Sequence, residues 1–478
     1  MSEIVINPIT RIEGHGKITI EVDDRGKVTD ARFSILYLRG FEKFLEGCAI
    51  EDVPKFMPRI CGVCPVAHHF ASVKAVDALM KVKVPETAEK IRRLWYAVNS
   101  IHDKVLILAG TGAPDLLLPN ATQRTRNVLT VIKENPELGK KVLELRKMGQ
   151  EASRIISGKA IHPFTAVPGG VSFKMTEAKV KEIKALGKNA MPIATDILEL
   201  IKKTTYNLVE KKGDLLEKLG NIETNYLALT RADGASDFYD GDMAFMDLKG
   251  KVTKFHPADY LNYVAENTVD YSYGKYPYWK ALGFPNGSMR VGTLARANVC
   301  EKYATPTAQE YLEDFRKSFG RPAHVTMLYH YARAIELMHK VEEYMDLIDD
   351  PAILGNDTIG DVGQPGAGRG VGVVEAPRGV LLHDYETDEQ GMVKDINCIV
   401  ATTWNNASID RSVKVAAQKL ITTNSPDEKI LNTIEMVTRA YDPCLSCSAH
   451  SVDGSYPLVI EVYDTHGNKV REIRNTRE

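Results

Sequence analysis

The sequence contains no continuous apolar run of the length that a membrane-spanning helix needs, which is roughly 20 residues. Its most apolar stretch, residues 105–119, is interrupted by Gly110, Gly112, Pro114 and Asp115. The first residues, Met1-Ser2-Glu3-Ile4, carry no basic segment followed by an apolar one, so a secretory signal is not predicted. These absences predict a cytoplasmic protein without a membrane span.

An excess of charge of either sign is also missing. The 478 residues include 61 lysines and arginines against 63 aspartates and glutamates, a formal net charge of −2. A nucleic-acid-binding stripe or a polybasic membrane patch needs a clear basic excess, so neither is predicted. Hydrophobic residues make up 44% and charged residues 26% of the chain, which is typical of a globular protein with a sizeable core.

Cysteine is scarce, and its odd count of seven does not suit a disulfide framework. Four cysteines form two Cys-x-x-Cys pairs at opposite ends of the chain, Cys61 with Cys64 and Cys444 with Cys447. Two such pairs can bring four thiolates to one soft or borderline metal ion. The pattern leaves three interpretations open: a catalytic metal centre, a structural zinc site, or redox-active dithiols. Zinc ribbons usually have their pairs only about 15–20 residues apart, which weighs against zinc.

The apolar periodicity predicts an α+β fold that is mainly helical. Apolar residues at three- and four-residue spacing predict helices over 86–108, 125–156, 177–218, 307–349, 406–421 and 426–440. Alternating apolar and polar residues predict one hairpin over 18–35 and another over 456–473. No repeat or low-complexity linker divides the chain, so we expect one compact body.

A glycine-rich segment and two isolated cysteines look like binding motifs, but their surroundings in the sequence do not support that function. The glycine-rich segment 366–372 looks like a phosphate-binding loop, but no Lys-Ser or Lys-Thr pair follows it. We interpret it as a flexible approach to Arg378. Cys48 and Cys300 are isolated, and we expect them to be packed thiols rather than ligands.

The residues around both cysteine pairs carry a resemblance to a known family. Beside Arg59-Ile60-Cys61-Gly62-Val63-Cys64-Pro65 and Asp442-Pro443-Cys444-Leu445-Ser446-Cys447-Ser448-Ala449-His450, its motifs are Pro8-Ile9-Thr10-Arg11-Ile12-Glu13-Gly14-His15, Arg39-Gly40-Phe41-Glu42, Ile161-His162-Pro163, Pro168-Gly169-Gly170, Glu375-Ala376-Pro377-Arg378-Gly379 and Ala401-Thr402-Thr403-Trp404-Asn405. In this order they resemble the large, catalytic subunits of nickel–iron hydrogenases from end to end. Among these, the cytosolic multi-subunit type is most similar, in particular the methanogen enzyme that partners heterodisulfide reductase.

The resemblance implies the large-subunit fold of that family, with small β elements at the N-terminus and near the C-terminus. Residues 1–450 would form the catalytic domain, with an N-terminal β region (1–45), a helical body (46–360) and a C-terminal part of strands and helices (361–450). Residues 451–478 would be an extension that is removed once nickel is loaded. On this view His450 reaches its metal only when the chain end folds inward.

The resemblance also implies the metal ligands. Cys61 and Cys444 would be terminal nickel ligands, whereas Cys64 and Cys447 would bridge nickel and an iron that carries carbonyl and cyanide. Soft thiolates suit a nickel ion that changes oxidation state, and the Cys444 thiolate would accept a proton when dihydrogen splits. A separate magnesium or iron ion would be held by Glu42, His450 and the main-chain carbonyl of Cys398. Without the resemblance, His450 would suit a zinc site equally well.

The remaining implied roles surround the metals. The resemblance makes Glu13 the first relay for the proton from Cys444, whereas its spacing alone favours a structural carboxylate that caps a helix or pairs with Arg11. Arg378 would lie over the open metal position and be oriented by Asp442. Four further residues would line the pocket or bond a bridging sulfur: Pro377, Ala401, Thr402 and His68. The family usually has proline at position 401, so that wall is expected to differ.

The predicted activity is reversible oxidation of dihydrogen, with electrons leaving through an iron–sulfur small subunit. No ferredoxin-type cysteine run is present, so the electron carriers are expected in partner subunits, including a heterodisulfide reductase system. Reduction of a nicotinamide or a deazaflavin remains an alternative. A non-catalytic subunit of the quinone-module type is a second alternative, but that relative lacks the four cysteines.

Overall fold

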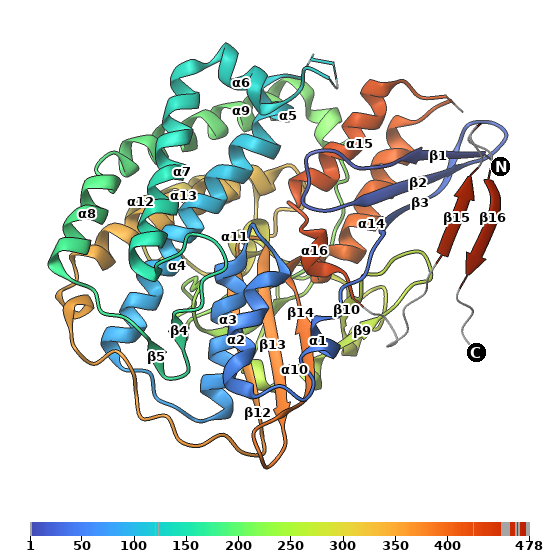
Figure 1. Cartoon of the computed structure of the whole chain (residues 1–478). Helices are drawn as coiled ribbons and strands as arrows, with labels where there is room; N and C mark the ends of the chain where they lie inside the picture. Colours follow the sequence, from blue (N-terminus) through green and yellow to red (C-terminus); the bar gives the residue numbers. More distant parts are fainter. Residues whose placement is uncertain are drawn as a thin grey trace.

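A mainly helical α+β architecture is present in the computed structural model, which describes residues 2–119, 121–122, 124–423, 425–450, 459–463, 466 and 469–474. Figure 1 shows the long helices from α4 to α13 gathered on one side, with the N-terminal sheet, α14 and α15 on the other. The predicted fold class is therefore confirmed. No helix in these ranges is both long enough and apolar enough to cross a membrane.

The helices follow the predicted periodicity but are divided more finely. Their bounds are α1 (Phe41–Phe44), α2 (Val53–Phe56), α3 (Pro65–Leu79), α4 (Glu86–Ile107), α5 (Ala113–Leu117), α6 (Val128–Glu134), α7 (Pro136–Ser157), α8 (Glu177–Gly187), α9 (Ala190–Lys218), α10 (Tyr260–Tyr263), α11 (Thr293–Val299), α12 (Pro306–Phe319), α13 (Leu328–Asp349), α14 (Ala401–Leu420), α15 (Glu428–Ala440) and α16 (Leu445–Ser448). The single helix predicted over 125–156 is divided before Pro136, because proline cannot donate a hydrogen bond within a helix. The helix predicted over 307–349 is likewise interrupted around Gly320 and Pro322.

The strands form several small sheets. β1 (Ser2–Ile6), β2 (Gly16–Val22) and β3 (Val28–Ile35) make the N-terminal antiparallel sheet, which contains the predicted hairpin. The range predicted as a helical body also contains a four-stranded sheet of β11 (Met289–Arg290), β6 (Asn225–Thr230), β7 (Asp242–Met246) and β8 (Val252–Phe255). The short pairs are β4 (Ala166–Val167) with β5 (Gly170–Val171), and β9 (Val264–Asn267) with β10 (Tyr276–Trp279). β15 (Val459–Tyr463) pairs with β16 (Lys469–Arg474), as the second predicted hairpin requires.

A three-stranded sheet packs on helix α3 and places Arg378 at one end. β12 (Gly368–Ala376), β13 (Gly379–Thr387) and β14 (Val393–Ile399) are antiparallel, and α3 packs against β12 and β13. The turn between β12 and β13 consists of Pro377 and Arg378, so it presents the Arg378 side chain at the end of the sheet. Gly379 follows with a φ of 131°, a conformation that glycine adopts without strain.

The glycine-rich segment is not the flexible approach that its sequence suggested. Residues 368–376 form β12, and this strand lies against the backbone of α3. A Cβ atom at Gly370 would lie 2.1 Å from the carbonyl oxygen of Ala75, and one at Gly372 would lie 2.1 Å from that of Ala71. These glycines therefore permit close packing of a strand on a helix rather than the binding of a phosphate.

Replacing Gly370 with alanine should destabilise the fold by about 1–3 kcal/mol, because the new methyl group would force β12 away from α3. Thermal unfolding should show this as a lower Tm. Gly366→Ala is the matched control, since nothing lies within 4 Å of a Cβ at that position. Equal Tm values for the two variants would contradict the packing role of Gly370.

Candidate metal centre

The four cysteines of the two Cys-x-x-Cys pairs meet at one buried point. Their sulfur atoms all lie within 4.8 Å of one another, and each residue is at most 4% exposed. Between the two chain ends, Cys61 Sγ lies 3.4 Å from Cys444 Sγ, and Cys64 Sγ lies 3.5 Å from Cys447 Sγ. All four are free cysteines. The pairs therefore form one cluster of four thiols, as a single metal centre requires, and not two separate dithiols.

Each pair lies where a loop enters a helix. Cys64 immediately precedes α3, and Cys444 immediately precedes α16. Backbone N–H groups at the start of a helix have no partner within the helix and stabilise negative charge. The Val63 N–H points to Cys61 Sγ at 3.2 Å, which adds a donor to this sulfur. Burial raises the pKa of Cys444 and Cys447 well above the usual value of a thiol, so a bound metal ion is what would hold these sulfurs as thiolates.

Glu13 contacts the second cysteine pair directly. The Cys444 thiol donates to Glu13 Oε2 at 3.0 Å, and the Ser446 hydroxyl donates to Oε1 at 2.5 Å. A parallel bridge joins the backbones of Glu13 and Cys444, and the Leu445 N–H donates to the Glu13 carbonyl at 3.0 Å. The alternative partner, Arg11, instead forms an ion pair with Asp115. Glu13 is therefore placed to exchange a proton with Cys444, and the structural pairing with Arg11 is not found.

Arg378 lies in a buried group of charges at the same site. Its Nε donates to the main-chain oxygen of Asp442 at 2.7 Å, and one terminal nitrogen donates to the Asp442 carboxylate at 3.1 Å. The other terminal nitrogen, NH1, is buried and has no partner among the described residues. Burial lowers the pKa of this guanidinium, but the Asp442 and Asp103 carboxylates outweigh it and raise the pKa well above the usual value. Arg378 is therefore a fixed positive charge with one donor left for another group.

Asp103 is a member of this group that sequence reasoning missed. It is 1% exposed, and neither of its carboxylate oxygens has a hydrogen-bond partner in the described part of the chain. Burial raises its pKa to about 7, although the Arg378 charge acts in the opposite direction. The only sequence signal was an aspartate at a position of α4 where helical periodicity places the residue inside the core.

Of the expected pocket-lining residues, Thr402 contacts the cysteine site directly. Pro377 and Ala401 are buried, the first in the β12–β13 turn and the second at the start of α14. The Cys444 N–H donates to Thr402 Oγ1 at 2.9 Å, so the Thr402 hydroxyl hydrogen is free to be donated to another group.

The predicted bond from His68 to a sulfur is not seen. His68 Nδ1 instead meets His383 Nε2 at 3.2 Å, and its own Nε2 is buried without a partner among the described residues. Burial lowers the pKa of His68 to about 4, so both rings are neutral near pH 7. His383, held by the Tyr385 hydroxyl at 2.7 Å, was not foreseen because a lone histidine in a strand carries no signal of its own.

The predicted ligands of the second ion also converge. His450 Nε2 lies 3.0 Å from the Cys398 carbonyl oxygen and 3.7 Å from Glu42 Oε1. Glu42 and His450 line a cavity of about 250 Å³. Glu42 Oε1 is buried without a hydrogen-bond partner in the described residues, while Oε2 pairs with Arg39 at 2.7 Å. One vacant carboxylate oxygen beside a carbonyl oxygen and an imidazole suits a hard divalent cation.

His450 has this position in a chain that continues to Glu478. The inward fold of the chain end that the resemblance implies is present at His450, and removal of residues 451–478 stays a prediction. The backbone N–H of His450 donates to the Tyr273 carbonyl oxygen at 2.8 Å, which helps to position the residue. Residues 451–458, where the predicted extension begins, lie outside the described residues.

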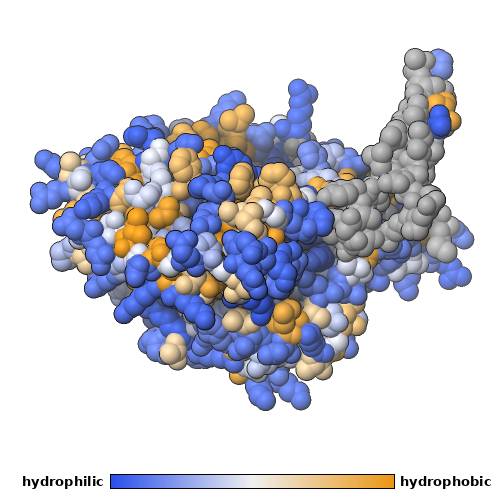
Figure 2. Space-filling view, turned by 60° about the horizontal axis from the view of Figure 1, so that its bottom comes forward, coloured by the Kyte–Doolittle hydropathy of each residue, from blue (hydrophilic) through white to orange (hydrophobic). Residues whose placement is uncertain are grey.

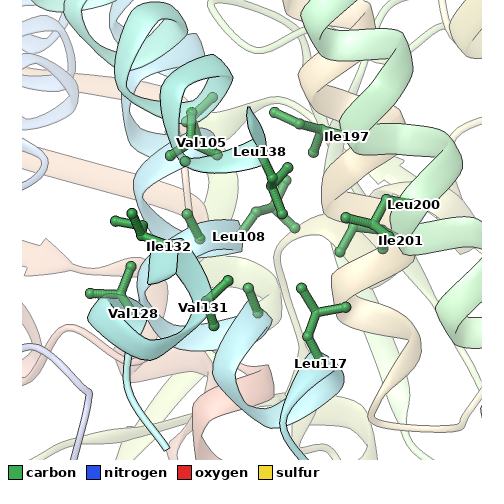
Figure 3. Close-up of a pocket in the computed structure, with 14 residues that line it drawn as sticks. Val105, Leu108, Leu117, Val128, Val131, Ile132, Leu138, Ile197, Leu200 and Ile201 are labelled. Carbon is green, nitrogen blue, oxygen red and sulfur yellow. The ribbon is translucent and has the colours of Figure 1, made fainter. Parts of the chain in front are cut away.

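An enclosed apolar pocket elsewhere does not compete with this site. Figure 3 shows aliphatic side chains from α4, α6, α7 and α9 pointing into it, among them Val105, Val131, Leu138 and Ile201. None of its lining residues is titratable or a metal ligand. It therefore cannot carry acid–base or redox chemistry.

Known proteins are similar to this chain in sequence and in fold. The chain matches a family model described as nickel-dependent hydrogenase over residues 39–109 and 232–450, and one described as HoxL-like over residues 3–38. It is 42% identical to one subunit of the F420-non-reducing hydrogenase vhc of Methanococcus voltae, over 98% of this chain and 99% of that one. It is 38% identical to the beta subunit of the NAD-reducing hydrogenase HoxS of Cupriavidus necator, over 98% and 99%. A solved NAD+-reducing NiFe-hydrogenase in the H2-reduced state superposes with a TM-score of 0.89 at 37% identity, covering 94% of this chain and all of that one.

Proposed function

Given that the chain belongs to the nickel-dependent hydrogenase family, as a catalytic large subunit, we propose that it oxidises dihydrogen reversibly at the four-cysteine site and passes the electrons to an iron–sulfur small subunit. The observation that carries this proposal is the convergence of four buried thiols with a carboxylate at Cys444 and an unpartnered guanidinium nitrogen. A structural zinc site would need neither of these polar groups.

The donor set suits a nickel–iron centre, which Cys61, Cys64, Cys444 and Cys447 would hold. When bound, the metal pair supplies the Lewis acidity and the redox change that split dihydrogen into two protons and two electrons. The Arg378 NH1 group is a suitable donor to a cyanide ligand of the iron, and Pro377, Ala401 and Thr402 line the remaining wall of the pocket.

Proton transfer is assigned to Cys444 and Glu13. The Cys444 sulfur takes a proton from the reaction, and Glu13 Oε2, 3.0 Å away, receives it. Hydrogen bonds from the Ser446 hydroxyl and N–H keep the carboxylate aimed at the sulfur. A distance within hydrogen-bond reach is the first requirement for a general acid or base. Asp442 has a different role, because it orients Arg378 through two contacts.

A magnesium or iron ion is proposed at Glu42, His450 and the Cys398 carbonyl. Arg39 connects this cavity to the metal centre, because its Nε donates to the Cys447 carbonyl at 2.9 Å and its NH1 pairs with Glu42. The bound cation and Arg39 together would compensate the negative charges of Glu42 and of the nearby cysteine thiolates. The role of the cation would be to keep the C-terminal cysteine pair in place.

The proposed electron partners follow from the relatives. The small subunit needs an accessible face, and Figure 2 shows apolar residues in several separate patches on one side of the molecule. Phe44, Ile161 and Phe164 are among the exposed large apolar residues.

Relatives named F420-non-reducing favour a route to a heterodisulfide reductase system over a deazaflavin. The NAD-reducing relative keeps a nicotinamide acceptor as the second candidate. A cytoplasmic location stays a prediction.

The first test is the metal content of the purified hydrogenase complex. We expect about one nickel and one iron in the cysteine site of each chain, infrared bands from carbonyl and cyanide, and oxidation of dihydrogen. Cys447→Ser should lose nickel and these bands, because a bridging thiolate is gone. Cys48→Ser is the control and should keep both, since Cys48 is not in the cluster. Zinc alone in the wild type would refute the proposal.

The second test concerns the proton relay. Glu13→Gln should retain nickel and the infrared bands but lose most H/D exchange, because an amide cannot shuttle the proton from Cys444. Glu21→Gln, which changes a carboxylate on the neighbouring strand β2 that pairs with Arg32, is the control and should exchange normally. Normal exchange in Glu13→Gln would remove this residue from the pathway.

The third test concerns the extension. We propose that residues 451–478 are removed during maturation and that residues 1–450 are the catalytic domain. The nickel-dependent hydrogenase match ends at residue 450, which supports a boundary there. Intact-mass measurement of active enzyme should give the mass of residues 1–450. A full-length mass in fully active protein would contradict the proposal.

A further inference from the structure

Two left-handed turns lie beside the contact between the two ends of the chain. Four residues other than glycine in the described ranges have a positive φ, and Arg11 (φ 57°) and Asp442 (φ 55°) are two of them. Arg11 stands two residues before Glu13, and Asp442 stands two residues before Cys444. A residue with a Cβ atom is strained in this conformation, so other contacts must hold each turn.

The Arg11 turn is held by the start of helix α5. One terminal nitrogen of Arg11 donates to the carbonyl oxygen of Thr111 at 3.0 Å, and the other donates to Asp115 Oδ1 at 2.5 Å. Thr111 belongs to a π-helical turn, Leu108–Gly112, that leads into α5, and Asp115 lies in α5 itself. In the described part of the chain, Asp115 is the carboxylate with which Arg11 forms an ion pair. The conformation of the turn therefore depends on this one buried acid.

Asp115 also binds Arg439, near the end of α15. Arg439 Nε donates to Asp115 Oδ2 at 2.8 Å, and one terminal nitrogen donates to Oδ1 at 3.2 Å. The other terminal nitrogen donates to Glu435 Oε2, one helical turn earlier, at 2.6 Å. The main-chain carbonyl of Arg439 accepts the Asp442 N–H at 3.0 Å, which closes the second left-handed turn. Hydrogen bonds therefore connect Asp115 to both turns.

Thr10 completes this buried group on the N-terminal side. Its hydroxyl donates to Glu435 Oε2 at 2.7 Å, and Arg439 lies 3.3 Å from both the carbonyl and the hydroxyl oxygen of Thr10. Two guanidinium groups, of Arg11 and Arg439, thus meet two carboxylates, of Asp115 and Glu435. Asp115, Glu435 and Arg439 are at most 3% exposed. Two buried cations this close repel each other unless a carboxylate contacts both, and Asp115 does so.

We propose that Asp115 is a positioning residue for the proton relay: it holds Arg11 and Arg439 together and so keeps the loop that carries Glu13 docked on the segment that carries Cys444. The inference rests on the proposed function. Both turns lead directly into the parallel backbone bridge between Glu13 and Cys444, where the carboxylate lies 3.0 Å from the sulfur. Without Asp115, the Arg11 guanidinium would move toward water and its turn would relax. Glu13 would then leave hydrogen-bond reach of Cys444.

The alternative is that Asp115 only stabilises the fold, by linking the N-terminal loop to α5 and α15. Both roles predict a lower Tm when its charge is removed, so stability cannot separate them. Only the positioning role predicts slower proton transfer at sites whose metals are undisturbed. Nickel content and the carbonyl and cyanide bands report the metals. The H/D exchange rate per nickel and the solvent isotope effect on kcat report proton transfer.

The first test is Asp115→Asn in the purified complex. An amide has one acceptor atom and one donor atom, so it cannot accept bonds from two guanidinium groups at both positions. We expect wild-type nickel and infrared bands, H/D exchange per nickel about tenfold slower, and a larger solvent isotope effect. Asp77→Asn is the matched control, because Asp77 forms a buried ion pair with Arg92. This control should lower the Tm but exchange normally. Wild-type exchange in Asp115→Asn, or equal slowing in both variants, would overturn the proposal.

The second test compares Arg11→Ala with Arg11→Gly. Both variants remove the guanidinium and leave Asp115 paired with Arg439, so neither has an unpaired buried charge. Glycine adopts the left-handed conformation of this turn without strain, whereas alanine does not. With wild-type infrared bands in both, Arg11→Ala should exchange more slowly per nickel than Arg11→Gly. Equal rates would overturn the proposal, as would loss of nickel in Asp115→Asn beside a loaded Asp77→Asn. Absence of carbonyl and cyanide bands in the wild type would instead refute the proposed function itself.

Discussion

The structure depends on holding four thiolates from opposite ends of the chain at one buried point. Like charges within 4.8 Å of one another repel, and the metals that offset this can bind only after the cysteines have converged. The protein meets this constraint with backbone contacts. Glu13 and Cys444 form a parallel bridge, and the Cys444 N–H is held by Thr402. The N-terminal sheet, α3, α14 and α16 must therefore be in place together before the site exists.

Buried ion pairs surround the metal site. Arg378 pairs with Asp442, Lys104 and Arg296 pair with Glu336, and Arg296 also pairs with Glu375. These pairs reduce the cost of burying their charges, whereas the Asp103 carboxylate has no hydrogen-bond partner among the described residues. The buried polar atoms left without a partner in the described residues include Arg378 NH1 and Glu42 Oε1. Both are at positions where a metal centre or a cation would complete the bonding.

Packing around the site is equally constrained. β12 approaches α3 so closely that Gly370 and Gly372 leave no room for a side chain. This contact sets the distance between Cys64, at the start of α3, and the Arg378 turn, at the end of β12. Small shifts there would change how the guanidinium meets the metal ligands. The glycine-rich segment therefore serves the site through rigidity and not through mobility.

The sequence by itself determined the fold class, the four-cysteine cluster, and the partners Glu13, Arg378, Asp442, Glu42 and His450. These residues stand in short motifs, where local order and residue chemistry carry the information. The sequence could not show that Arg11 pairs with Asp115 and not with Glu13, or that His68 is hydrogen-bonded to His383. It also could not show that Asp103 and Lys104 are buried. It also misjudged the glycine-rich segment, which forms most of strand β12. Such features arise from contacts between helices and strands far apart in the chain, and only the tertiary structure decides which buried charges become neighbours.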